Sequence, residues 1–414
     1  MSHVVFGSRP ALSPLMIGVG EHRQRIMDAV RPLPAETRAL RTAHGRALAA
    51  EVRSRWPLPL FDASAMDGYA VRAAEARTGA TLRVVADLPA GSPADPGLGP
   101  GEAARIMTGA PVPSDADAVV PLEHTDLGTA VRAIAPERVT VLSAPERGAH
   151  IRRAGEDRRT GEVVVPAGAE LTAWRISAIA SAGHDRVLVG AAPRVAVIST
   201  GTELVPPAST PARGQIPESN SVLLDAAIPG AGAVVASARS APDDPATLRR
   251  ALADAAGAAE VIVLTGGASV GSFDVVKSVL ASDHGIRFDT VAMQPGKPQG
   301  FGVHEGRLVF CLPGSPVGMA VSFEMFVRPA LRAMAGFADV ERRRASFRAS
   351  GSWRCSTGRM QVIPVIVDGD SVRPAAGPGG RHPISSLATA DGLAVIPEEV
   401  GAVDEGDLVS VMLL

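Results

Sequence analysis

Arg194-Val-Ala-Val-Ile-Ser-Thr200 and Glu260-Val-Ile-Val-Leu-Thr265 are the two stretches of sequence that decide the fold. Each contains a short, continuous apolar run of strand length. Strands that are apolar on both faces are typical of a parallel sheet covered by helices on both sides. A third run lies at 307–312, and helical patterns begin at Asp243-Asp244-Pro245, at Asp274 and at Ser315. This alternation predicts a parallel α/β domain over residues 192–335.

The remaining sequence predicts three smaller units around this domain. Residues 61–150 are rich in Gly, Pro and short apolar runs, which predicts a small β domain, and residues 336–414 predict a second one. Residues 15–60 and 151–191 predict one helical linker domain, because an Ala/Arg-rich helical pattern covers 20–52 and a helix at 172–182 ends before Gly183. We therefore expect the chain to leave one domain, build another and return.

Composition excludes several classes of function. The formal net charge of −2 gives no broad basic field for nucleic acid. No stretch of eighteen or more apolar residues could span a membrane, and the first residues lack the apolar core of a secretory signal. Cys311 and Cys355 have no metal-binding spacing and are typical of a reducing compartment. We expect a cytoplasmic protein.

Four loops are expected at the carboxyl ends of the predicted strands, where open α/β sheets bind ligands. They are Ser199–Glu203, Thr265–Asp274, Gln294–Pro298 and Leu312–Pro316. Two of them combine glycines, small hydroxyls and a helix start, a composition that suits phosphate. The candidate substrate-binding residues in these two loops are Gly266, Gly267, Ser269, Gly271, Pro313, Gly314, Ser315 and Pro316.

Charged side chains accompany the same loops. Lys277 and Lys297 are the only two lysines among 41 basic residues, and both flank the expected anion site. Asp274, Glu203 and Asp243 would lie near that anion, and carboxylates beside phosphate indicate Mg²⁺. Simpler interpretations stay open: Gly266-Gly267 as a tight turn, Asp243 as a helix cap, Glu203 as a solvated loop residue, and the lysines as chance retention.

The sequence resembles the molybdopterin molybdenumtransferase family, of the MoeA and gephyrin E-domain type, over about residues 18–414. The most specific motifs are Ser64-Ala-Met-Asp-Gly-Tyr-Ala70, Met107-Thr-Gly-Ala-Pro-Val-Pro113, Gly155-Glu-Asp157, Ser199-Thr-Gly-Thr-Glu-Leu204, Pro295-Gly-Lys-Pro298 and Leu312-Pro-Gly-Ser-Pro316. The resemblance implies a homodimer of four-domain chains whose α/β domain is the MogA-like, molybdopterin-binding one. It also implies molybdenum cofactor biosynthesis: molybdenum from molybdate enters adenylated molybdopterin (molybdopterin-AMP), and AMP is released.

By motif position, the resemblance links ten residues to activity: Asp67, Thr108, Asp157, Glu203, Asp243, Asp274, Lys277, Lys297, Pro313 and Pro316. It implies that Asp67 and Thr108 act from the partner subunit. Asp274, with Glu203 or Asp243, is the expected magnesium ligand set, and Arg152 and Arg153 are candidates for holding molybdate. A MogA-type adenylyltransferase is the expected supplier of substrate.

Departures from the family pattern and rival functions remain. Gln294 replaces a second lysine of some members, Glu218 a usual aspartate and Ser315 a frequent asparagine, and Arg381-His-Pro-Ile-Ser-Ser386 lacks the usual Gly-Ser pair. The rivals are a MogA-like adenylation reaction, a dimeric scaffold that binds a partner peptide, and a paralogue that uses tungsten.

Overall fold

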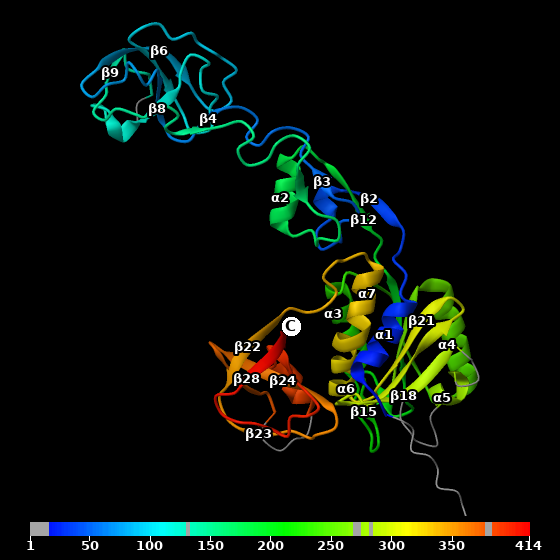
Figure 1. Ribbon diagram of the computed structural model, residues 1–414. Helices are drawn as coiled ribbons and strands as arrows, with labels where there is room; N and C mark the ends of the chain where they lie inside the picture. The colour runs from blue at the N-terminus through cyan, green and yellow to red at the C-terminus, as the bar shows by residue number, and fades with distance from the viewer. Residues whose placement is uncertain (1–15, 130–132, 268–274, 281–284, 377–382) are drawn as a thin grey trace, which may run out of the picture.

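The computed structural model describes residues 16–129, 133–267, 275–280, 285–376 and 383–414. The molecule is elongated (Figure 1): a β body stands at one end, a narrow segment follows, and two bodies lie side by side at the other end. This architecture confirms the expected class of α/β plus β units. Among the described residues, no helix is long and apolar enough to cross a bilayer.

A seven-stranded sheet forms the centre of the α/β body. Its parallel part has the order β21-β17-β13-β16, with the bounds β13 (Arg194–Thr200), β16 (Val234–Ala241), β17 (Val261–Thr265) and β21 (Arg307–Leu312). Successive side chains of a strand point to opposite faces. Val195 and Val197 accordingly enter one core, while Ala196 and Ile198 enter the other.

The prediction of a wholly parallel sheet is wrong at one side. β18 (Ile286–Val291) and β20 (Pro298–His304) run antiparallel, β20 also runs antiparallel to β21, and β1 (Met16–Ile17) lies beside β18. β20 starts with Pro298 and contains Gly300 and Gly302. Proline and glycine weaken the sequence signal of a strand, which is why this segment was not predicted.

Helices cover both faces of the sheet. One core contains residues of α1 (Val19–Ala29), α3 (Asn220–Gly230), α6 (Pro316–Ser322), the π-helical turn η3 (Phe323–Val327) and α7 (Arg328–Met334). The other contains residues of α4 (Pro245–Ala258) and α5 (Val275–Leu280). The predicted helices from 245, 275 and 315 are confirmed, although the last is interrupted by the π turn.

The narrow segment contains more strand than predicted. The helical pattern expected over 20–52 ends at Ala29, and α1 packs on the α/β sheet through Val19 and Ile26. β2 (Ala35–Ala39), the turn η1 (Leu40–Thr42) and β3 (Val52–Arg53) follow. β2 pairs with β12 (Arg186–Gly190), and β3 with β11 (Val163–Val165). The helix expected at 172–182 is confirmed as α2 (Ala173–Ser181), whose first turn is capped by Thr172.

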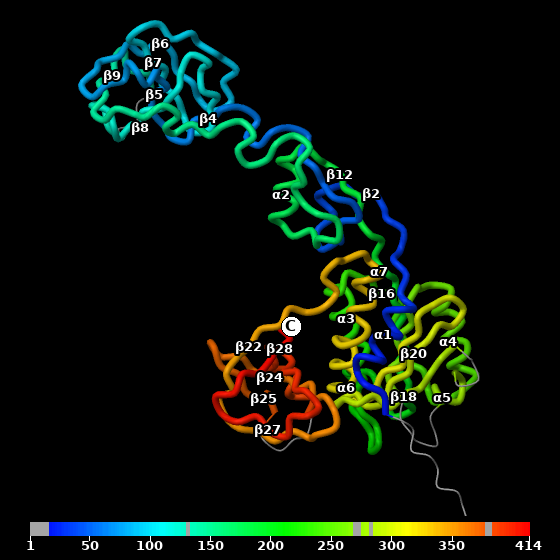
Figure 2. Tube along the Cα trace, in the orientation of Figure 1, coloured from blue at the N-terminus to red at the C-terminus, as the bar shows by residue number. Residues whose placement is uncertain are grey.

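The distal β body is built on a five-stranded sheet of order β8-β5-β7-β6-β9. Its bounds are β5 (Gly68–Val71), β6 (Thr81–Leu88), β7 (Glu102–Ile106), β8 (Ala118–Pro121) and β9 (Arg138–Thr140), with the turn η2 (Leu122–His124). The chain enters and leaves through the antiparallel pair β4 (Ala63–Ser64) and β10 (Ile151–Arg152), so its two connections run together (Figure 2).

The C-terminal body is a small closed β structure. β24 (Met360–Asp368), β25 (Ser371–Pro374), β22 (Arg344–Ala349), β28 (Leu408–Leu413) and β26 (Gly392–Ile396) pair in turn, and β26 pairs back with β24. Its smaller elements are β23 (Trp353–Arg354), β27 (Ala402–Val403) and the turn η4 (Ile384–Ala388). β19 (Met293–Gln294), which leads into the Lys297 loop, adds to β24 and joins the two neighbouring bodies.

Candidate functional site

A cavity of about 760 Å³ opens at the carboxyl ends of β13, β17 and β21. All four predicted loops reach it. The site candidates that line it are Glu203, Asp243, Gly266, Gly267, Lys297, Pro313, Gly314, Ser315 and Pro316. The structure thus brings both described candidate metal ligands, one lysine and the Pro313–Pro316 turn to a single pocket.

The other sheet-edge candidates have different outcomes. Ser269, Gly271 and Asp274 lie outside the described residues. Lys277 is exposed on α5, and it is not among the cavity-lining residues, although Val275 at the start of the same helix is. Of the two lysines, only Lys297 therefore faces this pocket directly in the described part of the chain.

Asp243 and Asp244 have separate tasks. Asp244 caps α4, because its Oδ2 accepts a hydrogen bond of 2.7 Å from the Thr247 N–H. Asp243 instead accepts bonds of 3.0 and 3.1 Å from the N–H and the hydroxyl of Thr202. The simpler interpretation of Asp243 as the helix cap is wrong, since the neighbouring carboxylate fills that role and leaves Asp243 on the cavity wall.

Two glycines allow the loops to approach closely. At Gly201, a Cβ atom would lie 2.7 Å from a carboxylate oxygen of Glu203. At Gly266, φ is +88°, and a Cβ would lie 2.4 Å from the Thr200 carbonyl oxygen. A side chain at Gly266 would push its loop away from the Thr200 backbone, whereas one at Gly201 would displace the Glu203 carboxylate within the same loop.

A hydrogen-bond network fixes the first and fourth loops relative to one another. The buried Glu218 carboxylate accepts bonds from the Ser199 hydroxyl (3.1 Å) and from the N–H groups of Asn220 (2.8 Å) and Ser221 (3.0 Å) at the start of α3. Asn220 in turn donates 2.9 Å from Nδ2 to the Gly314 carbonyl. The glutamate that departs from the family's usual aspartate is therefore a structural cap beneath the cavity.

The Lys297 loop is fastened to α6 by a residue that the sequence did not single out. Gln299 is buried, and its Nε2 donates to the Gly296 carbonyl (2.6 Å) and the Ser322 hydroxyl (2.7 Å). Ser322 donates 2.7 Å to the Gly318 carbonyl within α6. Asn220 and Gln299 were both missed as functional candidates, because a lone amide in a sequence carries no signal of what it contacts.

A second cavity, of about 840 Å³, lies in the distal β body, and Asp67 and Thr108 are among the residues that line it. Asp67 Oδ1 accepts bonds of 2.7 Å from both the N–H and the hydroxyl of Thr108. These bonds, the backbone one first, hold the pKa of Asp67 below its usual value. Arg105 pairs with Asp87 in the same wall, and this partner keeps the pKa of Arg105 raised.

Asp157 lines neither of these two cavities. It is exposed, it lies in the connection to the distal body, and its carboxylate is 3.4 Å from Arg158. The candidate molybdate arginines beside it are engaged: Arg152 pairs with Glu156, and Arg153 with Asp62. The structure therefore does not bring Asp157 or these arginines together with the sheet-edge residues of the same chain.

Among the described residues, no group of three or more His, Cys, Asp or Glu side chains could hold a metal ion by itself. Glu203 and Asp243 provide two carboxylates on the wall of one cavity. Two carboxylates that share the ion with substrate phosphate oxygens are the set that Mg²⁺ commonly uses, so the residues fit this ion.

Three family profiles match consecutive parts of the chain. They are the MoeA N-terminal region (domains I and II) over residues 17–183, a probable molybdopterin-binding domain over 196–333, and the MoeA C-terminal region (domain IV) over 347–414. Together the three matches cover most of the sequence.

Individual relatives agree over nearly the whole length. The chain is 40% identical to molybdopterin molybdenumtransferase 2 of Mycobacterium tuberculosis over 404 residues, which is 94% of this chain and 98% of the relative. It is 30% identical to the molybdopterin molybdenumtransferase of Haemophilus influenzae, over 96% and 98% of the two chains. A solved MoeA protein from Pyrococcus horikoshii OT3 superposes with a TM-score of 0.82 at 26% identity, over 97% and 100%.

Proposed function

Because this chain belongs to the molybdopterin molybdenumtransferase (MoeA) family, we propose that its sheet-edge cavity binds adenylated molybdopterin and molybdate. The chain is a transferase of molybdenum cofactor biosynthesis. In the proposed reaction, molybdenum enters the dithiolene of molybdopterin and AMP leaves. The observation that carries the site is the convergence of Lys297, Glu203, Asp243 and the Pro313–Pro316 turn on one cavity.

The residues of this cavity match the charge of such a substrate. Lys297 supplies a compact ammonium, which acts as a point charge on a phosphate oxygen. The glycines of the Gly266-Gly267 turn leave room for a phosphate to approach the backbone. The cavity has room for several groups at once, and Leu204 and Ile216 give part of its wall an apolar character. We infer that the phosphate side faces Lys297 and Gly266.

Glu203 and Asp243 are the residues that would hold Mg²⁺. When bound, this ion would neutralise charge on the phosphate oxygens as the anhydride is cleaved. Thr202 holds Asp243 in place through its N–H and hydroxyl, so the carboxylate needs little reorganisation when the substrate arrives. Asp274 remains a proposed third ligand.

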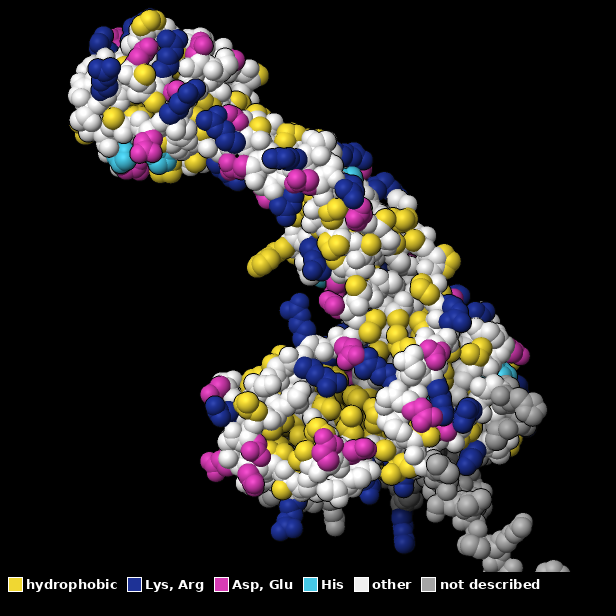
Figure 3. Space-filling model, in the orientation of Figure 1, with side chains coloured by type: hydrophobic (Ala, Val, Ile, Leu, Met, Phe, Trp, Pro, Cys, Tyr) yellow, Lys and Arg dark blue, Asp and Glu magenta, His cyan; other side chains and the backbone are white. Residues whose placement is uncertain are grey.

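We further propose that the active assembly is a homodimer. Asp67 and Thr108 lie in a cavity of the distal body, at the opposite end of the molecule from the sheet edge (Figure 1). If they act on the same substrate, they must come from a second chain. Apolar side chains also gather in the hollow between the C-terminal strands and helices α3 and α6 (Figure 3), and such patches are typical of protein interfaces. In this assembly, Asp157 and Lys277 are still proposed to contribute to activity, and Glu203, Asp243 and Asp274 to hold the metal ion.

The supply of substrate and the compartment complete the proposal. Adenylated molybdopterin requires an adenylyl-transfer reaction upstream, which a MogA-type adenylyltransferase would provide. Both cysteines are free thiols, which is consistent with the cytoplasm.

The test is AMP release from adenylated molybdopterin in the presence of Mg²⁺. AMP that appears only when molybdate is added supports the proposal. Lys297→Ala should lower the rate by about 100-fold or more, as expected for the loss of one charge that stabilises the transition state. Arg249→Ala, an exposed position on α4 outside the cavity, is the matched control. Absence of AMP with either molybdate or tungstate would favour the scaffold function instead.

A further inference from the structure

The backbone on both sides of Lys297 is held by hydrogen bonds. On one side, the Gly296 carbonyl accepts a bond of 2.6 Å from Gln299 Nε2. On the other side, the Lys297 carbonyl accepts a bond of 2.8 Å from the Val291 N–H. These carbonyls belong to the two planar peptide groups that precede and follow the Lys297 Cα atom. Fixing both groups sets the direction in which the lysine side chain leaves the backbone.

The bond from Gln299 is the one of the two that depends on a side chain. Gln299 is only 1% exposed, so its amide is shielded from water. A primary amide has two N–H donors. Nε2 donates to the Gly296 carbonyl and, at 2.7 Å, to the hydroxyl of Ser322, which is fully buried in α6. Gln299 therefore ties the lysine loop to a helix through both of its donors.

Two glycines let this loop lie directly against α6. Gly296 has a φ of +98°, which favours glycine, and a Cβ atom there would lie 3.0 Å from the Ser322 hydroxyl oxygen. A Cβ at Gly318 would lie 2.6 Å from the Ser315 hydroxyl oxygen and 3.6 Å from the Gly296 nitrogen. The lysine loop and the turn that opens α6 are thus packed together at Gly318.

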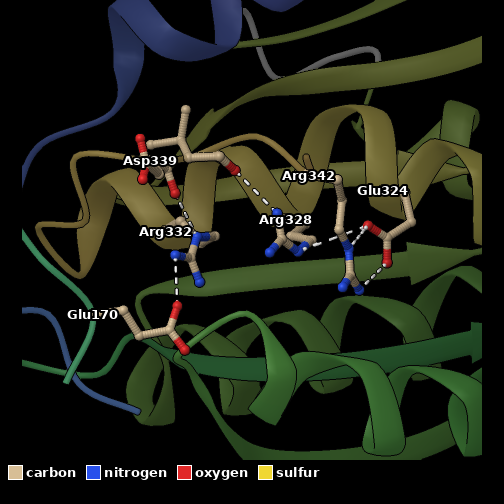
Figure 4. Close-up of polar contacts among 7 residues, drawn as sticks. Glu170, Glu324, Arg328, Arg332, Asp339 and Arg342 are labelled. Carbon is tan, nitrogen blue, oxygen red and sulfur yellow. Dashed lines mark hydrogen bonds and ion pairs between the residues drawn. The ribbon is translucent and has the colours of Figure 1, made fainter. Parts of the chain in front are cut away.

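The helix to which the loop is tied is fixed at its far end. α6 continues without a break through η3 into α7. In η3, Glu324 accepts two bonds of 3.0 Å from Arg342, and in α7, Arg332 donates a bond of 3.0 Å to Glu170 (Figure 4). Both partners lie outside the helical run. The helix is therefore a fixed support for the lysine loop.

We propose that Gln299, through Ser322, is a positioning residue that holds Lys297 where charge develops on the substrate phosphate. This inference rests on the proposed function of the sheet-edge cavity. Lys297 is exposed and lines that cavity, whereas Gln299 does not line it and so acts through the lysine. Electrostatic catalysis depends on groups that are in place before the reaction, and a displacement of about 1 Å can lower a rate about 100-fold.

Gln299→Met tests the tie, because methionine is of similar length and has no N–H donor. We expect kcat for AMP release to fall about tenfold, while KM for adenylated molybdopterin stays within about threefold, since the lysine charge is needed most as the anhydride is cleaved. Ser322→Ala keeps the bond to the Gly296 carbonyl and should cost only about threefold in kcat. Thermal denaturation would confirm that both variants are folded at the assay temperature.

A double-mutant cycle with Lys297→Ala separates positioning from a general structural effect. If Gln299 acts through the lysine, Gln299→Met should change the residual rate of Lys297→Ala by less than about twofold. A general loosening of the cavity would instead lower the rate about tenfold in both backgrounds.

Ser54→Ala is the matched control for Ser322→Ala. Each serine is buried and donates a bond of 2.7 Å from its hydroxyl to a backbone carbonyl. Ser54 lies beside β3 in the narrow segment and does not line the sheet-edge cavity. Ser54→Ala should therefore keep wild-type kcat and KM.

Hydrogen exchange followed by mass spectrometry provides a readout that does not need the reaction. In Gln299→Met, peptides that cover residues 291–299 should exchange faster, whereas those that cover β13 should not change. Unchanged exchange, wild-type kinetics or an equal loss of rate in both backgrounds of the cycle would each overturn the proposal. If the wild-type chain released no AMP, the proposed reaction would be refuted, and the exchange measurement would still decide whether Gln299 holds the loop.

Discussion

Replacing Asp243 by Asn should abolish most activity while leaving the fold almost unchanged. The Asp243 carboxylate accepts two hydrogen bonds from Thr202, at 3.0 and 3.1 Å. The amide oxygen of Asn can accept the same two bonds, each of which contributes about 1 kcal/mol. The negative charge is lost, however, and with it the proposed contact to Mg²⁺. We expect AMP release to fall about 100-fold or more, with a melting temperature within about 2 °C of wild type.

Asp244→Ala is the matched control, because it removes the adjacent carboxylate. Asp244 caps α4 through the Thr247 N–H, at 2.7 Å, and does not line the cavity. Loss of a helix cap should lower the melting temperature by about 2–4 °C. The turnover of this variant should stay within about twofold of wild type, since no charge at the site changes. The two neighbours are therefore expected to show opposite effects on stability and on activity.

Both variants would be measured by thermal denaturation and by molybdate-dependent AMP release from adenylated molybdopterin. Activity should be assayed below the lower of the two melting temperatures, so that unfolding does not contribute to the rates. Wild-type turnover by Asp243→Asn would refute the assignment of this carboxylate to the site. An equal loss of turnover in Asp244→Ala would show that α4 as a whole, rather than the Asp243 charge, is what matters.

Three other predictions follow from buried or hydrogen-bonded groups. Glu218→Ala should lower the free energy of unfolding by about 2–4 kcal/mol in urea titrations, since it leaves Ser199 and the start of α3 without their acceptor; unchanged stability would contradict its role as a cap. Thr108→Val should raise the pKa of Asp67, measured by carboxyl ¹³C NMR, because the hydroxyl donor is lost, while the backbone N–H at position 108 still keeps that pKa below its usual value. The stability from this carboxylate is present above about pH 3.8 and is lost as the pH falls through its lowered pKa, so Thr108→Val should weaken that dependence. Burial lowers the pKa of His22 from 6.5 to about 4, so the unfolded chain binds a proton in that window and the folded chain does not. The free energy of unfolding should then decrease as the pH is lowered from about 6.5 to about 4, by up to about 1.4 kcal/mol per pH unit. His22→Leu should remove this part of the slope in urea titrations at several pH values.

The central strands could be predicted because burial on both faces leaves a direct mark in the sequence. The apolar runs at 194–200 and 260–265 form β13 and β17 as expected. The antiparallel strands β18 and β20 could not be predicted. β20 contains proline and glycine, which weaken the sequence signal of a strand, and its conformation depends on pairing with neighbouring strands of the sheet. The pattern after Ala29 was misleading because alanine and arginine favour helix locally, whereas pairing with β12 and β11 forms strands at 35–39 and 52–53.

The candidate site was predictable where a loop follows a strand. Glu203 and Pro313 were identified from their positions next to apolar runs, and Lys297 as one of only two lysines in the sequence; all three line one cavity. What the sequence could not provide is the network behind them. Glu218 and Gln299 act through contacts with residues distant in the chain, which no local pattern encodes.

The paired connection to the distal β body makes that body a separable module. Arg53 lies beside Val163 and Ser64 beside Ile151, so the outgoing and returning strands are neighbours at two successive points. A deletion between them could be closed by a tight turn, as in an ordinary hairpin. The shortened protein would keep the sheet-edge pocket intact and lack Asp67 and Thr108. Mixed with a full-length chain inactivated at Lys297, it would form an assembly in which each copy supplies what the other lacks.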